Sequence, residues 1–239
     1  MENLVNLKIN GKEVSVPQGT TILDAARKAG IRIPTLCYLR DINAIGACRV
    51  CVCEVKGARS LVASCVYPVN EGMEVFTNTP KVLASRKTTV ELILSDHHQD
   101  CLSCVRSENC ELQRLSKELG CDGNKYHGVK NSFALDESTP YIVRDNNKCI
   151  LCRRCVAACK NYQGVAVIGA NSRGFDTQIG SQFLKSLSEV SCVGCGQCIS
   201  VCPTGALREK DEIDNVLAAI HDPSKHVVFG TAPAVRVAI

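Results

Sequence analysis

The sequence predicts an α+β chain made of small modules, each gathered around a group of cysteines. Three observations predict this class. Residues 1–79 carry short strand patterns around one helical pattern, residues 80–138 carry two helical patterns, and residues 139–222 carry two runs of the form C-x2-C-x2-C-x3-C. We therefore expect three small domains with these boundaries, followed by a short segment over residues 223–239.

The first module should begin with a β-hairpin. The strand patterns LVNLKI and EVSVP flank Asn10-Gly11, a pair that tolerates the positive φ angles of a type I′ turn. A helix is expected over ILDAARKA, with Thr20 or Thr21 as its N-cap and Gly30 as its left-handed C-terminal cap. Short strands should follow around residues 50–55, 61–66 and 74–76.

Two helices are predicted in the second module. The first should begin at Pro80, which suits the first helical position, and end near Asp96. Its apolar positions are Val82, Leu83, Val90, Ile93 and Leu94. The second should cover residues 108–119, where leucines recur at helical spacing. Residues 121–138 have the composition of a surface connection, and GVAVIG and GFDTQIG within residues 161–190 predict a strand pair in the third module.

Sixteen side chains recur at spacings that suit iron-sulfur clusters. The two cysteine runs have the spacing of bacterial two-cluster ferredoxins, and Pro203 supplies the last position of that motif. We expect one 2Fe-2S cluster on a first set of four cysteines and a 4Fe-4S cluster on a set of one histidine and three cysteines. These two sets are Cys37, Cys48, Cys51 and Cys65, and then His97, Cys101, Cys104 and Cys110.

The two runs should exchange their last ligands and hold two further 4Fe-4S clusters. In two-cluster ferredoxins the fourth cysteine of each run binds the cluster of the other run. One cluster is therefore expected on Cys149, Cys152, Cys155 and Cys202, and the other on Cys192, Cys195, Cys198 and Cys159. This exchange would tie both runs into one domain.

Disulfides and structural zinc are the alternative uses of seventeen cysteines. Disulfide scaffolds are typically short and secreted, whereas this chain is long, has an odd cysteine count and begins MENLVNLKING with no apolar signal segment. Zinc sites use paired C-x2-C motifs and need no third cysteine at the same spacing. We therefore predict redox clusters and a reducing compartment, the cytoplasm.

Three further side chains compete with the predicted ligands. Cys53 forms a C-x-C with Cys51 but fits the pattern less well, so it is interpreted as a buried non-ligand. Cys121 is interpreted as a free structural thiol. His98 is adjacent to His97 and equally capable of ligation in principle, so the residues alone leave both histidines open.

The formal charge of +4 counts every thiol as neutral. Ligation deprotonates cysteine, and with about −2 on each all-cysteine cluster and about −1 on the histidine-ligated one the loaded chain carries roughly −3. Nucleic acid is therefore not an expected partner. No stretch reaches the roughly 18 apolar residues that span a bilayer. Because no G-x-G-x-x-G or P-loop motif is present, we expect no flavin or NAD site in this chain.

The motifs also resemble known families. The first module resembles the β-grasp fold of plant-type 2Fe-2S ferredoxins, with ten rather than four residues between the first two cysteines. The order of all four sets resembles the amino-terminal relay region of multi-cluster iron-iron hydrogenases and the related large peripheral subunit of NADH dehydrogenases. The segments that carry this resemblance are IPTLCYL, GACRVCVCEV, ELILSDHHQDCLSC, NKCILCRRCVAAC and CVGCGQCISVCPTGAL. It supports Cys51, His97 and the crossed assignment, and HVVFGTAPAVRVAI resembles the opening of the hydrogenase catalytic domain.

The resemblance implies an electron relay through four clusters in a cytoplasmic oxidoreductase complex of the NADH-linked or electron-bifurcating type. Its implied partners are a flavin- and NADH-binding iron-sulfur subunit, a small 2Fe-2S subunit and soluble ferredoxin. Residues 223–239 would only begin the catalytic domain, and no cysteines remain for its six-iron cofactor. We therefore expect no catalytic residue among the 239 residues. The alternative is an electron-transfer subunit of an NADH or formate dehydrogenase.

Overall fold

A five-stranded sheet and one helix form the amino-terminal module of the computed structural model, which describes residues 3–238. β1 (Leu4–Ile9) and β2 (Lys12–Pro17) pair antiparallel, and Asn10 and Gly11 between them have φ angles of 50° and 82°, as the predicted turn requires. The other strands are β3 (Val52–Val55), β4 (Val62–Ala63) and β5 (Glu74–Phe76). The sheet order is β2-β1-β5-β3-β4, in which β1 and β5 run parallel.

Helix α1 (Ile22–Lys28) packs against this sheet through four buried side chains: Ile22, Leu23, Ala25 and Ala26. Thr21 is the N-cap, because its side-chain oxygen accepts a hydrogen bond from the Asp24 amide at 3.2 Å. Gly30 follows the helix with a φ of 75°, as predicted. The long loop between α1 and β3 then carries Cys37, Cys48 and Cys51.

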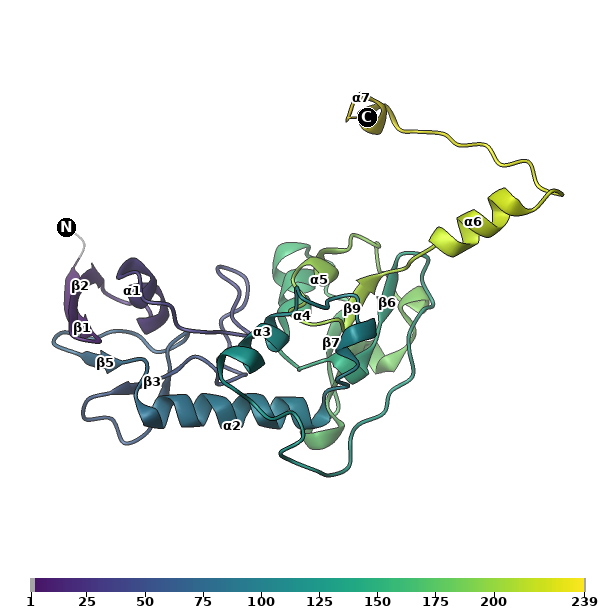
Figure 1. Cartoon of the computed structure of the whole chain (residues 1–239). Helices are drawn as coiled ribbons and strands as arrows, with labels where there is room; N and C mark the ends of the chain where they lie inside the picture. Colours follow the sequence, from purple (N-terminus) through teal and green to yellow (C-terminus); the bar gives the residue numbers. More distant parts are fainter. Residues whose placement is uncertain (1–2, 239) are drawn as a thin grey trace.

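Helix α2 (Pro80–Asp96) runs from the sheet module to the cysteine-rich modules (Figure 1). It has the predicted bounds, and the Thr79 side chain caps it by accepting from the Val82 amide. Its most buried stripe repeats every four residues: Val82, Arg86, Val90 and Leu94. Leu83, another apolar position of the helix, lies about 100° around the helix from Val82 and is 43% exposed.

Helix α3 (Glu111–Glu118) packs beside α2. It begins three residues later than predicted, because Glu108 has a positive φ of 65° and Cys110 is extended. A core between the two helices also takes in the ligand loop of the first module: Leu36, Val50, Val90, Leu94, Leu112 and Leu115. Residues 121–138 contain neither helix nor strand and are mostly exposed or half-buried, as predicted for a surface connection.

Two small antiparallel strand pairs frame the third module. β6 (Ile142–Arg144) pairs with β9 (Leu207–Glu209), and β7 (Ile168–Asn171) pairs with β8 (Gln178–Ser181), which is the predicted strand pair. Helices α4 (Arg154–Ala157) and α5 (Gln197–Ser200) lie within the two cysteine runs, and the π-helical turn Ala158–Tyr162 continues α4. Single 3-10 turns cover Cys101–Ser103, Asn146–Lys148, Gly174–Asp176, Gln182–Leu184 and Leu187–Glu189.

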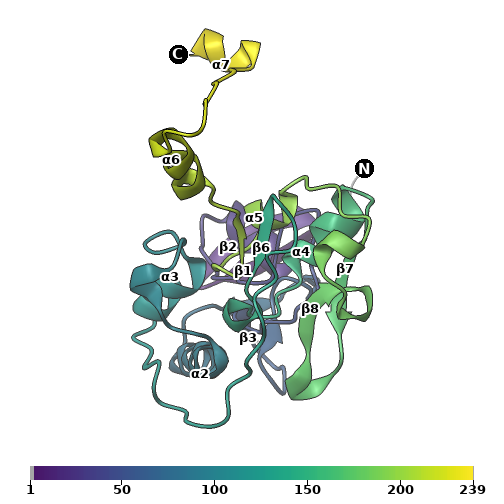
Figure 2. The same cartoon turned by 90° about the vertical axis from the view of Figure 1, so that its right-hand side faces the viewer.

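Helices α6 (Ile213–His221) and α7 (Pro233–Ala238) project away from the modules (Figures 1 and 2). Neither helix has a buried residue. The apolar stretch before α7 is irregular, and no strand of the described residues pairs with it. Between residues 3 and 238, no helix is long and apolar enough to cross a bilayer.

Candidate metal centres

The first predicted cysteine set meets beside the sheet of the first module. Cys37, Cys51 and Cys65 are each 1% exposed, and Cys48 is half-buried. The sulfurs of Cys51 and Cys65 lie 3.4 Å apart. Hydrogen bonds with Cys48 and Cys65, and then with the amides of Cys48 and Ala47, lower the pKa of the Cys37 thiol. Four gathered sulfurs and amides directed at sulfur suit a 2Fe-2S cluster.

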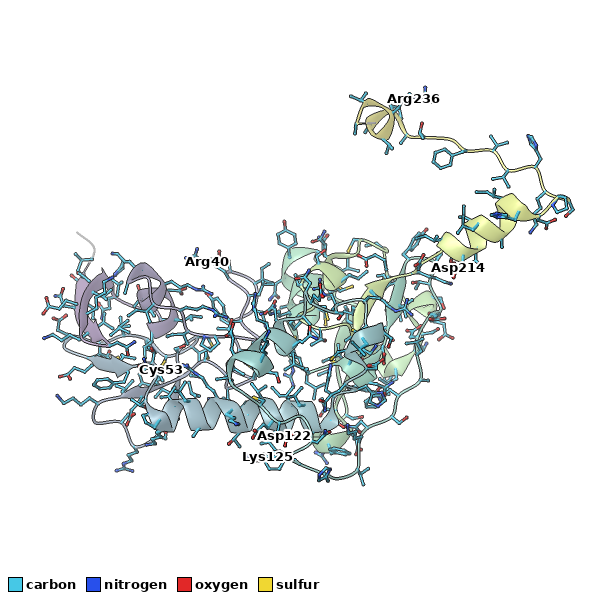
Figure 3. All side chains as sticks on the ribbon, viewed as in Figure 1. Arg40, Cys53, Asp122, Lys125, Asp214 and Arg236 are labelled. Carbon is cyan, nitrogen blue, oxygen red and sulfur yellow. The ribbon has the colours of Figure 1, made fainter. Side chains whose placement is uncertain are left out.

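Cys53 lies next to this set on β3, inside the amino-terminal module (Figure 3). Its side chain is fully buried, and burial raises the pKa of its thiol to about 11. Arg86 and Ser64 are close enough to lower that pKa in part. The Cys53 sulfur lies 3.7 Å from the carbonyl oxygen of Cys51, and its role as a non-ligand stays a prediction.

The exposure of the two histidines at the end of α2 differs sharply. His97 is 8% exposed, whereas His98 is exposed to solvent. Burial lowers the pKa of the His97 imidazole to about 4, so the ring is neutral at neutral pH. Its Nδ1 atom is buried and has no hydrogen-bond partner among the described residues. A neutral, buried imidazole with an unpaired nitrogen suits metal ligation, and this geometry favours His97 over His98.

The three cysteines after His97 lie against the third module. Burial raises the pKa of Cys110, and the neighbouring Cys104 and Cys101 raise it further. Gly205 approaches this group so closely that a Cβ atom there would lie 2.5 Å from the sulfur of Cys104. Only glycine fits at that position without displacing the cysteine.

Each of the two crossed sets surrounds its own cavity. Four cysteines of one set line the first cavity: Cys149, Cys152, Cys155 and Cys202. Those of the other set line the second: Cys192, Cys195, Cys198 and Cys159. Arg144 and Leu207 line both cavities, and Arg144 forms an ion pair with Asp136 at 2.8 Å. The contact between α4 and α5 brings the last cysteine of each run to the other run.

The backbone of both runs turns through the left-handed region at matching positions. In the first run Leu151 and Arg153 have φ angles of 54° and 59°, and in the second run Gly194 and Gly196 have 63° and 71°. Leucine and arginine rarely adopt this conformation, and such residues concentrate at functional sites. The turn directs backbone amides at sulfur. The Leu151 amide lowers the pKa of the Cys149 thiol, but burial has the larger effect and raises that pKa to about 12.

Across residues 3–238, no three His, Cys, Asp or Glu side chains are arranged to hold a single metal ion. The donors of an iron-sulfur cluster bind different irons and therefore stand around a larger space. The two cysteine-lined cavities provide spaces of that kind.

Buried polar side chains connect the predicted sites. The Asn43 amide group donates to the carbonyls of Cys37 at 2.8 Å and Cys152 at 3.2 Å, which belong to different sets. Arg154 donates to both carboxylate oxygens of Glu111, the residue after Cys110, at 2.7 and 2.9 Å.

These connecting residues are not among those predicted from the sequence. Asn43 carries no local signal, because its partners lie elsewhere in the chain. Arg86 of α2 joins no two sites but does carry a local signal, because a charged residue there occupies the four-residue repeat of Val82 and Val90.

Comparisons with known families cover most of the chain. Residues 2–80 match a family described as the 2Fe-2S iron-sulfur cluster binding domain. Residues 86–125 match the NADH-ubiquinone oxidoreductase-G iron-sulfur binding region. Residues 139–208 match the ferredoxin-like domain of NADH-quinone oxidoreductase subunit 3.

Individual relatives have related descriptions. The chain is 45% identical to the NADP-reducing hydrogenase subunit HndD of Solidesulfovibrio fructosivorans, over 99% of this chain and 41% of that protein. It is 38% identical to the mitochondrial NADH-ubiquinone oxidoreductase 78 kDa subunit of Neurospora crassa, over 86% of this chain and 28% of that protein. The chain thus spans less than half the length of these curated relatives.

A solved structure extends the comparison to the fold. A chain of an NAD+-reducing NiFe hydrogenase in its H2-reduced state superposes with a TM-score of 0.80 and 28% identity. The similarity covers 86% of this chain and 87% of that chain.

These matches define an iron-sulfur protein with 2Fe-2S and 4Fe-4S ferredoxin-like domains. More particularly, the chain corresponds to the N-terminal region of a subunit of the NADH-quinone oxidoreductase G type or of an NAD-reducing hydrogenase. The predicted relation to NADH dehydrogenases is therefore confirmed. The matches do not specify an iron-iron catalytic centre.

Proposed function

We propose that this chain relays single electrons between a flavin- and NADH-binding subunit and the hydrogen-activating domain of an iron-iron hydrogenase. The observation that carries the relay is the gathering of the predicted cysteines into separate groups, two of them around cavities of their own. The hydrogenase setting has separate support. The match to the hydrogenase subunit covers 99% of the chain, against 86% for the Neurospora protein, and the TAPAVR phrase resembles the start of a hydrogenase catalytic domain.

The proposed cofactors are one 2Fe-2S and three 4Fe-4S clusters. The 2Fe-2S cluster is assigned to Cys37, Cys48, Cys51 and Cys65. The 4Fe-4S clusters are assigned to His97, Cys101, Cys104 and Cys110, and to the two crossed sets that line the cavities. The proposed domains are a β-grasp 2Fe-2S domain over residues 1–79, a helical His/Cys3 domain over residues 80–138, and a two-cluster ferredoxin-like domain over residues 139–222.

When bound, the clusters supply one-electron transfer. The chain holds them through thiolates and one imidazole, and its backbone amides donate hydrogen bonds to sulfur. Apolar side chains, among them Leu207, line both cavities. Asn43 joins the backbone of the first set to that of Cys152, so these two sites share a short hydrogen-bonded connection.

The metal content tests this assignment. We expect about 14 irons per chain, with matching sulfide, after anaerobic reconstitution of the full chain. Electron paramagnetic resonance of the reduced protein should show one 2Fe-2S and several 4Fe-4S signals. Stoichiometric zinc without labile sulfide would refute the relay.

A second candidate is an electron-transfer subunit of an NADH dehydrogenase, which the matches of residues 86–125 and 139–208 favour. The electron donor of the native complex distinguishes the two, since relatives of both classes are longer than this chain. Reduction of the native complex by H2 would support the hydrogenase. A native complex that NADH reduces and H2 does not would support the dehydrogenase.

A further inference from the structure

Arg86 carries a positive charge into the interior of the amino-terminal module. Its side chain is 4% exposed, and its Nη2 donates to the carbonyl of Val52 at 2.7 Å. Its Nε is buried and has no hydrogen-bond partner in the part of the chain that the structure describes. An arginine stays protonated in proteins, so this charge is permanent.

The surroundings of Arg86 differ from those of the other buried arginines near the predicted sites. Arg144 pairs with Asp136 and Arg154 pairs with Glu111. Arg86 forms no ion pair with a carboxylate among residues 3–238. A buried charge is costly unless an opposite charge compensates it.

The groups that can compensate Arg86 belong to the first cysteine set and its neighbours. Cys53 and Cys51 both lie near enough to influence the guanidinium electrostatically. The Ser64 hydroxyl is also buried without a partner, and it adjoins the same two thiols. The interior side of Cys51 therefore holds one uncompensated cation and one unpaired hydroxyl.

We propose that Arg86 is the buried counter-charge of the 2Fe-2S site and raises its reduction potential. The inference rests on the proposed binding of a 2Fe-2S cluster by Cys37, Cys48, Cys51 and Cys65. Reduction by an external one-electron donor adds one negative charge to that cluster and breaks no bond. A fixed cation in a poorly hydrated interior stabilises the more negative state, and net charge and hydrogen bonds to sulfur are established determinants of cluster potential. Arg86 is thus a positioning residue that acts through the environment of Cys51.

The test is a redox titration of the 2Fe-2S signal in the reconstituted full chain, followed by electron paramagnetic resonance. Arg86→Met removes the charge and keeps much of the side-chain length, whereas Arg86→Lys keeps the charge. Lys81→Met is the matched control, because Lys81 lies on the same helix and is exposed. We expect Arg86→Met to weaken reduction at least tenfold, which is about 59 mV for a one-electron couple.

The expected pattern has three further parts. Arg86→Lys should stay within about threefold of wild type, Lys81→Met should leave the titration unchanged, and the 4Fe-4S signals should not shift in any variant. A 2Fe-2S signal that titrates as in wild type in Arg86→Met would overturn the inference.

Assembly failure is also informative. If Arg86→Met assembles no 2Fe-2S cluster, a wild-type titration in Arg86→Lys supports the charge role, and loss of the signal in both variants refutes it. Absence of a 2Fe-2S signal from the wild-type chain would instead refute the proposed function.

Discussion

The exchange of cysteines between the two runs can be tested by counting irons. Cys149 and Cys152 line one cavity together with Cys155 and Cys202, whereas Cys159 lines the other. The double variant Cys149→Ala/Cys152→Ala removes two donors from the first cavity only. Iron should therefore fall from about 14 to about 10 per chain, because one 4Fe-4S cluster is lost.

A third substitution in this background separates the crossed from the uncrossed arrangement. Adding Cys202→Ala should leave about 10 irons, because Cys202 belongs to the cavity that is already empty of its cluster. Adding Cys159→Ala should lower the count further, toward about 6, because Cys159 belongs to the second cavity. The assay is iron and sulfide analysis of the anaerobically reconstituted full chain, with circular dichroism as a check on folding.

The opposite order of these two triple variants would refute the crossed assignment. In an uncrossed arrangement Cys202→Ala lowers the iron count and Cys159→Ala leaves it unchanged. Cys121→Ala in the same background is the control, because this half-buried thiol lines neither cavity. A double variant that still binds about 14 irons would contradict the site itself.

Three further predictions concern single side chains. His97→Ala should cost about four irons per chain and His98→Ala none; equal losses would contradict the buried ligand. Leu112→Ala should lower the free energy of unfolding by about 2–5 kcal/mol in urea denaturation, and the fully exposed Leu102→Ala should change it by less than about 0.5 kcal/mol. Burial raises the pKa of Asp136, but hydrogen bonds from Ser138 and Arg144 outweigh it and lower the pKa overall. Its stabilising contribution is therefore present above the unfolded-state pKa of about 4 and is lost as pH falls below it. The Tm difference between wild type and Asp136→Asn should stay constant from about pH 7 to about pH 5 and narrow below about pH 4.

The elements that were predicted well have strong local signals. The Asn10-Gly11 turn, the capped α1 and the whole of α2 formed where expected, because turn and cap chemistry depends on residues that are neighbours in the sequence. The start of α3 was predicted less well. The helix was expected from residue 108, but Glu108 has a positive φ of 65° and the helix begins at Glu111.

The sequence by itself determined the class of cofactor and the candidate donors, because the number of residues between cysteines limits which sulfurs can reach one cluster. It also indicated the relation to NADH dehydrogenases that the comparisons confirm. Only the tertiary structure decided what surrounds those donors. Asn43 reaches a carbonyl 109 residues away, and Arg86 reaches one 34 residues away. The charges and hydrogen bonds around a site come from all the segments that pack there. The spacing of residues within one segment does not predict which other segments those are.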